Sequence, residues 1–176
     1  AEDAVDSPLF EDLAARQFLL RTADGGTCVI GEDEESADES RPEDAAAGHG
    51  IVDFTHPGAY AWWRDAHEPL FADGIDAISC DRGERVPDHA VAFNGDTGRR
   101  LHNVYPLLYN QCAFDATAKF QRREDAPPVV RGRAAWTASQ RCPVQWAGEA
   151  QSDWEGLAAS VRGALSWGMS GAPCHG

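Results

Sequence analysis

Lysine is almost missing from this chain of 176 residues. It carries 15 basic residues against 29 acidic ones, a formal net charge of -14, and Lys119 is its single lysine. A surface this negative repels phosphate backbones, which argues against a nucleic-acid partner. The composition indicates a halophile-like protein, whose carboxylates are screened by salt, or a GC-rich genome; the two explanations are compatible.

The chain also lacks a long apolar run and closely spaced cysteines. No stretch approaches the ~20 apolar residues of a membrane-spanning helix. The five cysteines are odd in number and widely spaced, without a CxxC pair, which argues against a disulfide framework and a zinc ribbon. We therefore expect a cytoplasmic protein with reduced thiols and no membrane partner.

The length suggests one domain, although a complete (β/α)8 barrel typically needs ~250 residues. We therefore expect residues 1–176 to be the central part of a longer catalytic barrel. An acidic segment at about 31–48 lacks apolar periodicity and predicts a solvated loop. Before it, residues 18–21 and 27–30 flank Asp24-Gly25-Gly26, which is typical of a hairpin.

After the acidic segment, short apolar runs alternate with helical patterns. The expected elements are a strand at 51–54, a helix at 57–71, a strand at 75–80, a loop at 82–102, a helix capped by Asn103 through about Arg122, strands at 129–133 and 142–146, and a helix opened by a capping box at 152–155. The alternation predicts an α/β fold, a partial (β/α)8 TIM barrel with parallel strands. Functional side chains in such sheets follow the carboxyl ends of the strands.

Asp81 directly follows the strand expected at 75–80. A carboxylate there would point into the barrel mouth, Gly83 would let the backbone turn sharply, and Arg82 and Arg85 would favour the ionised form that a nucleophile needs. The alternative is an aspartate that caps the loop or pairs with an arginine.

Glu149 follows the strand expected at 142–146, close to Trp146. The indole lowers the local dielectric, which suits a general acid; the alternative is a glutamate placed by the dipole of the next helix. Arg133 ends another strand and could bind a sugar hydroxyl or hold a carboxylate. Two carboxylates at neighbouring strand ends are the equipment for glycoside hydrolysis, with retention at a spacing of ~5–5.5 Å.

These motifs resemble glycoside hydrolase family 31, and within it the α-xylosidase branch. The resemblance runs from Ser7 to the C-terminus, and its clearest stretches are Asp53-Phe54-Thr55-His56-Pro57, Asp81-Arg82-Gly83-Glu84-Arg85, Gln140-Arg141-Cys142-Pro143-Val144 and Trp154-Glu155-Gly156-Leu157. It implies a barrel that hydrolyses terminal α-linked sugars with retention and without a cofactor. The family nucleophile falls on Asp81, the acid/base on Glu149, the sugar-binding arginine on Arg133 and the pocket tryptophan on Trp146.

Several positions depart from the family pattern. The acid/base position holds glutamate where the family has aspartate. Arg82 occupies a position where the family has phenylalanine, and Ala134 one where it has serine. Ser79 occupies the position of the substrate-binding lysine of the xylosidase branch. The leading hypothesis is an α-xylosidase-like hydrolase acting on an oligosaccharide or α-glycoside. The alternatives are an α-glucosidase or sulfoquinovosidase of the same family, or a catalytically silent carbohydrate-binding relic. For the isolated chain we expect little activity, and open sheet edges that favour homo-oligomers.

Overall fold

The computed structural model describes residues 2–4, 7–31, 48–123, 125–142 and 144–175. The acidic segment predicted at 31–48 lies almost entirely outside these residues. The chain forms two units, one of residues 1–61 and 85–102 and one of residues 62–84 and 103–176. No helix within the described ranges combines the length and apolarity needed to cross a membrane.

The first unit contains a three-stranded antiparallel sheet in the order β1-β3-β2. Its elements are β1 (Glu2–Ala4), α1 (Pro8–Ala15), β2 (Val29–Ile30), β3 (His49–Ile51) and α4 (Gly98–Leu101). The predicted hairpin is confirmed: Arg21 bridges Thr27, and Gly25 adopts a left-handed φ of 90° at the turn.

The strand predicted at 51–54 lies two residues earlier, as β3. The buried carboxylate of Asp53 ends it, because this side chain accepts hydrogen bonds from the backbone N–H of Thr55 (2.9 Å) and of Phe93 (2.6 Å). A side chain that bonds its own backbone two residues on forms a turn in place of a strand ladder.

The second unit contains the predicted parallel sheet, in the order β4-β5-β6-β7. Its strands are β4 (Ile78–Cys80), β5 (Val130–Gly132), β6 (Val144–Gln145) and β7 (Cys174–His175). The crossovers contain α5 (Tyr105–Phe120), the 3₁₀ helix η1 (Ser139–Arg141) and α6 (Trp154–Met169). Strands linked by these crossovers confirm a partial (β/α)8 architecture.

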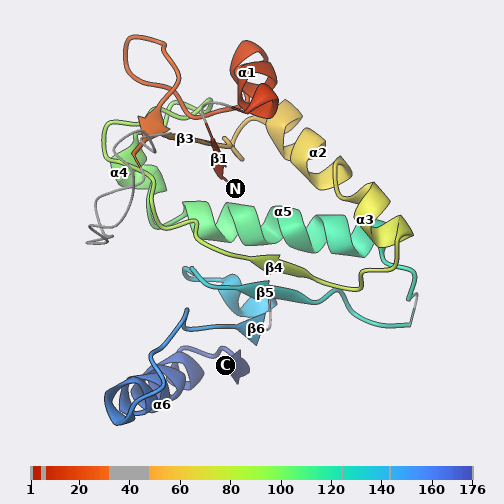
Figure 1. The fold of residues 1–176 in the computed structure, drawn as a ribbon, viewed down its shortest axis with the longest axis vertical. Helices are drawn as coiled ribbons and strands as arrows, with labels where there is room; N and C mark the ends of the chain where they lie inside the picture. Colours follow the sequence, from red (N-terminus) through yellow and green to blue (C-terminus); the bar gives the residue numbers. More distant parts are fainter. Residues whose placement is uncertain (1, 5–6, 32–47, 124, 143, 176) are drawn as a thin grey trace. The chain divides into compact units, whose positions relative to one another are not determined.

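Helix α5 runs along β4 and β5 (Figure 1). Its buried face includes Tyr105, Tyr109 and Cys112. Close packing requires Gly132 of β5 to have no side chain, because an added methyl group would lie 2.8 Å from the amide nitrogen of Asn110. Burial raises the pKa of the Cys80 thiol to about 12 and that of Cys142 to about 11.

Three predicted helix boundaries differ from the structure. The helix at 57–71 is two helices, α2 (Pro57–Asp65) and α3 (Glu68–Ala72), because Pro69 lacks an N–H and its ring would clash with the carbonyl four residues earlier. Helix α5 begins after Val104, one residue beyond the expected cap. Helix α6 is capped by Asp153, whose carboxylate accepts from the N–H of Gly156 at 2.6 Å, so the expected capping box at 152–155 is wrong.

The apolar face predicted for α6 is present but exposed. Trp154, Leu157, Val161 and Leu165 are each more than half exposed in the described structure. This stripe contrasts with α5, whose apolar side chains lie in the core of the second unit.

Candidate functional site

Three predicted site residues lie side by side at the carboxyl ends of neighbouring strands of the second unit's sheet. We call them a row, because strand register places them next to one another. Cys80 pairs with Gly132, and Gly132 pairs with Gln145, so the residues that follow are Asp81, Arg133 and Trp146. The ladder continues through this row: the N–H of Arg133 donates to Cys80 O (3.0 Å), and the N–H of Trp146 donates to Gly132 O (3.1 Å).

Strand alternation decides which face this row occupies. Gly132 faces Asn110 of α5, and successive side chains of a strand point to opposite faces. Arg133, and with it Asp81 and Trp146, therefore points away from α5. The row lies at the carboxyl ends of β4, β5 and β6, where the active groups of parallel barrels gather.

A guanidinium lies between two carboxylates in this row. Nη1 of Arg133 is 3.0 Å from Oδ1 of Asp81, and Nη2 contacts Oε1 of Glu84. The Asp81 side chain is 51% exposed and that of Arg133 26%, so the nucleophile candidate faces solvent while its partner is more enclosed. Of the two roles predicted for Arg133, the structure shows the contact with carboxylates. The same ion pair is the arginine contact that was considered as the alternative role of Asp81.

The backbone after Asp81 explains how Glu84 returns to the same guanidinium. Arg82 and Gly83 both adopt left-handed conformations, with φ of 61° and 103°. The expected sharp turn at Gly83 is confirmed, and the N–H of Arg82 donates to Oδ1 of Asp81 at 2.7 Å. A left-handed arginine costs about 1–3 kcal/mol, and such strain clusters at functional sites.

Two arginines of β5 contact the Trp146 ring. The guanidinium carbon of Arg131 lies 4.4 Å from the ring centroid and that of Arg133 lies 5.9 Å away. Both distances are within the range of cation–π attraction. The indole therefore lies within cation–π range of two arginines that are two residues apart on the same strand.

Glu149 lies in the loop that follows Trp146 and is exposed. The loop passes close to Arg133, because a methyl group added to Gly148 would lie 3.6 Å from Cδ of that arginine. Gly148 has a φ of 92°, which turns the chain at this point. The loop bearing the second carboxylate therefore borders the Asp81–Arg133–Trp146 row.

The sequence did not identify every contact in this site. Arg85 donates to the carbonyl of Gly31 at 2.8 Å, and the backbone N–H of Arg82 donates to Asp81, contacts that the sequence did not specify. The partnership of Arg133 with Glu84 and the stacking of Arg131 on Trp146 were both missed. The signal for Arg131 was available, since residues two apart on a strand share a face.

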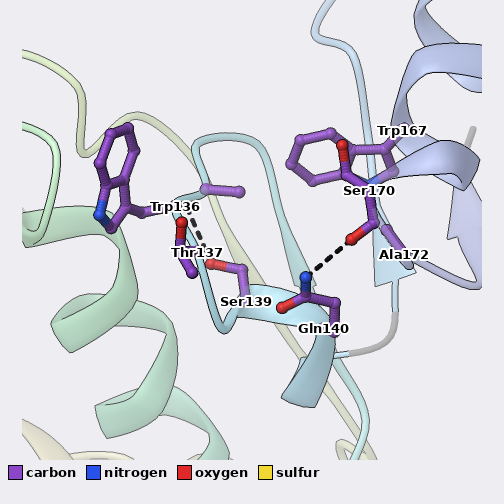
Figure 2. A pocket seen from close by; sticks show the side chains of 8 residues that line it. Trp136, Thr137, Ser139, Gln140, Trp167, Ser170 and Ala172 are labelled. Carbon is purple, nitrogen blue, oxygen red and sulfur yellow. Dashed lines mark hydrogen bonds between the residues drawn. The ribbon is translucent and has the colours of Figure 1, made fainter.

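In the described part of the second unit, a hollow lies apart from this row. Among the described residues, no three His, Cys, Asp or Glu side chains converge closely enough to hold a metal ion. A hollow of about 290 Å3 lies between the β5–β6 connection and the end of α6 (Figure 2). Its lining residues are Ala135, Trp136, Thr137, Ser139, Gln140, Trp167, Ser170 and Ala172.

Comparison with known proteins gives one consistent result. The model for the glycosyl hydrolases family 31 TIM-barrel domain matches residues 1–176. An α-xylosidase of Emericella nidulans is 33% identical over 126 residues, covering 71% of this chain and 16% of its own length. An α-xylosidase of Lactiplantibacillus pentosus is 30% identical over 174 residues, covering 96% of this chain and 20% of its own.

Among solved structures, a family 31 sulfoquinovosidase from E. rectale, in complex with an aza-sugar inhibitor, superposes with a TM-score of 0.82. The two are 27% identical, and the alignment covers 99% of this chain and 25% of that one. The chain therefore spans about a quarter or less of the length of these relatives.

Proposed function

The chain belongs to glycoside hydrolase family 31, within its TIM-barrel domain, and we propose that it carries the catalytic pair of a retaining α-glycosidase. Asp81 is the nucleophile and Glu149 the acid/base. The observation that carries the proposal is the row of Asp81, Arg133 and Trp146 at the carboxyl ends of three parallel strands, bordered by the Glu149 loop.

In the first step, a carboxylate oxygen of Asp81 attacks the anomeric carbon. The bond from that carbon to the leaving oxygen breaks, and the carboxylic acid of Glu149 protonates the leaving oxygen. In the second step, the Glu149 carboxylate takes a proton from water, the water oxygen bonds to the anomeric carbon, and Asp81 leaves with its electron pair.

Arg133 keeps the charge balanced through both steps. Asp81 loses its negative charge when the glycosyl ester forms, which would leave a lone guanidinium if Asp81 were its only partner. Glu84 remains in contact with Arg133 and supplies that partner. The ion pair therefore orients Asp81 without making it the sole counter-charge of the arginine.

Trp146 offers an apolar face beside the nucleophile. Its indole lies in the same row as Asp81, one strand beyond Arg133. A ring in this position suits stacking against the C–H face of a sugar, while the guanidinium of Arg133 can bind a hydroxyl.

The substrate we propose is a terminal α-xyloside, since two of the relatives described above are α-xylosidases. A sulfoquinovosidase is the second candidate, favoured by the superposition over almost the whole chain. Full-length protein should be assayed with 4-nitrophenyl α-D-xyloside, α-D-glucoside and α-D-sulfoquinovoside at equal concentration. Fastest turnover of the xyloside, with the α-anomer of xylose released first, is expected; preference for the sulfoquinovoside would select the second candidate, and no turnover of any would contradict the proposal.

A further inference from the structure

Arg131 is a second guanidinium on the face of the sheet that carries the candidate site. It precedes Arg133 by two residues on the same strand, and it pairs in register with Ser79 of β4 and Val144 of β6. Strand alternation places it on the Asp81 face, two residue positions before the Asp81–Arg133–Trp146 row. The catalytic roles proposed above give this arginine no task.

The two arginines differ in what holds them. Arg133 contacts the carboxylates of Asp81 and Glu84. In the described part of the chain, Arg131 makes no ion pair, and its guanidinium carbon lies 4.4 Å from the centroid of the Trp146 ring. Arg131 is also the nearer of the two cations to the ring, since Arg133 lies at 5.9 Å.

The position of the indole depends on such side-chain contacts. Trp146 follows the last residue of β6, and residues 146–150 have no regular secondary structure. A planar guanidinium stacked on an aromatic face fixes the plane of the ring better than a point charge does. Without Arg131, Arg133 is the cation that remains near the ring among the described residues, at the outer limit of the interaction.

We propose that Arg131 is a positioning residue, which fixes the indole of Trp146 in the orientation that stacks on the sugar. This inference rests on the proposed function, in which Trp146 binds the glycone. Its effect passes through the ring, so it concerns ground-state sugar binding rather than attack by Asp81. Removing it raises KM and leaves kcat almost unchanged.

The test uses full-length protein with 4-nitrophenyl α-D-xyloside. Arg131→Met, which keeps an unbranched side chain of similar reach without the charge, is expected to raise KM about two- to fivefold, the strength of an exposed cation–π contact. Arg131→Lys keeps a cation but not the planar group, and should recover only part of that loss. Arg162→Met, on the exposed surface of α6, is the matched control and should leave KM unchanged.

A double-mutant comparison separates positioning from direct contact with the sugar. In a Trp146→Leu background, Arg131→Met should have no further effect on KM, because the ring through which it acts is gone. An equal rise in KM in that background would show that Arg131 touches the substrate, and an unchanged KM in the wild-type background would show that it does nothing; either result overturns the proposal.

A binding measurement distinguishes failure of this inference from failure of the proposed function. Calorimetric titration of the Asp81→Asn variant with methyl α-D-xyloside reads affinity without turnover, and the added Arg131→Met change should weaken it by the same factor. Binding that weakens as expected in a protein with no hydrolytic activity would contradict the glycosidase proposal alone. Undiminished binding would contradict the positioning role alone, and failure of the Asp81→Asn variant to bind the sugar would overturn both.

Discussion

Replacing Arg133 tests how the two carboxylates of the site are organised. The guanidinium reaches Asp81 and Glu84 with different terminal nitrogens, the first at 3.0 Å. Lysine has one ammonium and cannot reproduce this fork. A charge-assisted hydrogen bond contributes about 1.5–3 kcal/mol when enclosed, but Asp81 is half exposed, so solvent screening reduces the loss to about 1 kcal/mol, or roughly fivefold. Arg133→Lys should therefore lower kcat/KM roughly fivefold.

Arg133→Met removes the charge and leaves the two carboxylates to repel each other. Asp81 then loses the group that orients it, and misplacement of a reacting atom by about 1 Å can cost ~100-fold in rate. Steady-state kinetics with 4-nitrophenyl and 2,4-dinitrophenyl α-D-xylosides measures this. The second leaving group needs little acid assistance, so a loss of similar size with both substrates assigns the effect to the nucleophile. An Arg133→Met variant within twofold of wild type, as expected of an Arg162→Met control, would refute the reasoning.

Two further predictions concern the acid/base and the buried thiols. Glu149→Gln should slow hydrolysis of the 4-nitrophenyl xyloside far more than that of the 2,4-dinitrophenyl xyloside. Added azide should restore turnover of the 2,4-dinitrophenyl xyloside and give a glycosyl azide, detectable by mass spectrometry. Equal losses with both substrates and no azide product would contradict the assignment. Burial raises the pKa of the Cys80 thiol from about 9 to about 12, so the folded state retains a proton that the unfolded state releases. The stabilisation is therefore complete below pH 9 and is lost as the pH rises from 9 towards 12. Urea unfolding should show this fall in the free energy of unfolding, and a Cys80→Ala variant should show less of it. Parallel curves of stability against pH for the two proteins would count against the buried thiol as the cause.

The strand ends of the second unit could be predicted because chain order and alternation carry that information. Asp81 follows one predicted strand, Arg133 and Trp146 end two others, and parallel strands align their carboxyl ends. The same pattern predicted α5 and α6 within a few residues. Family 31 and the partial barrel were both identified from the motifs and are confirmed by the comparison over residues 1–176.

The partners of these side chains could not be predicted from their neighbours in sequence. Arg82 and Arg85 adjoin Asp81 in the chain, yet Arg133 brings its guanidinium to it across the sheet, because register decides which side chains meet. The end of β3 also required a distant group, since the Asp53 carboxylate bonds the N–H of Phe93 forty residues away. Such contacts depend on tertiary packing, which local periodicity does not report.

Labelling of the nucleophile tests the central assignment most directly. Full-length protein would be incubated with 5-fluoro-α-D-xylosyl fluoride, a substrate whose glycosyl-enzyme forms faster than it hydrolyses, then digested and sequenced by mass spectrometry. The account predicts one fluoroxylosyl group, on the peptide that contains Asp81 and on that side chain. A label on Glu149 or Glu84, or an inactivated enzyme whose Asp81 is unmodified, would contradict it.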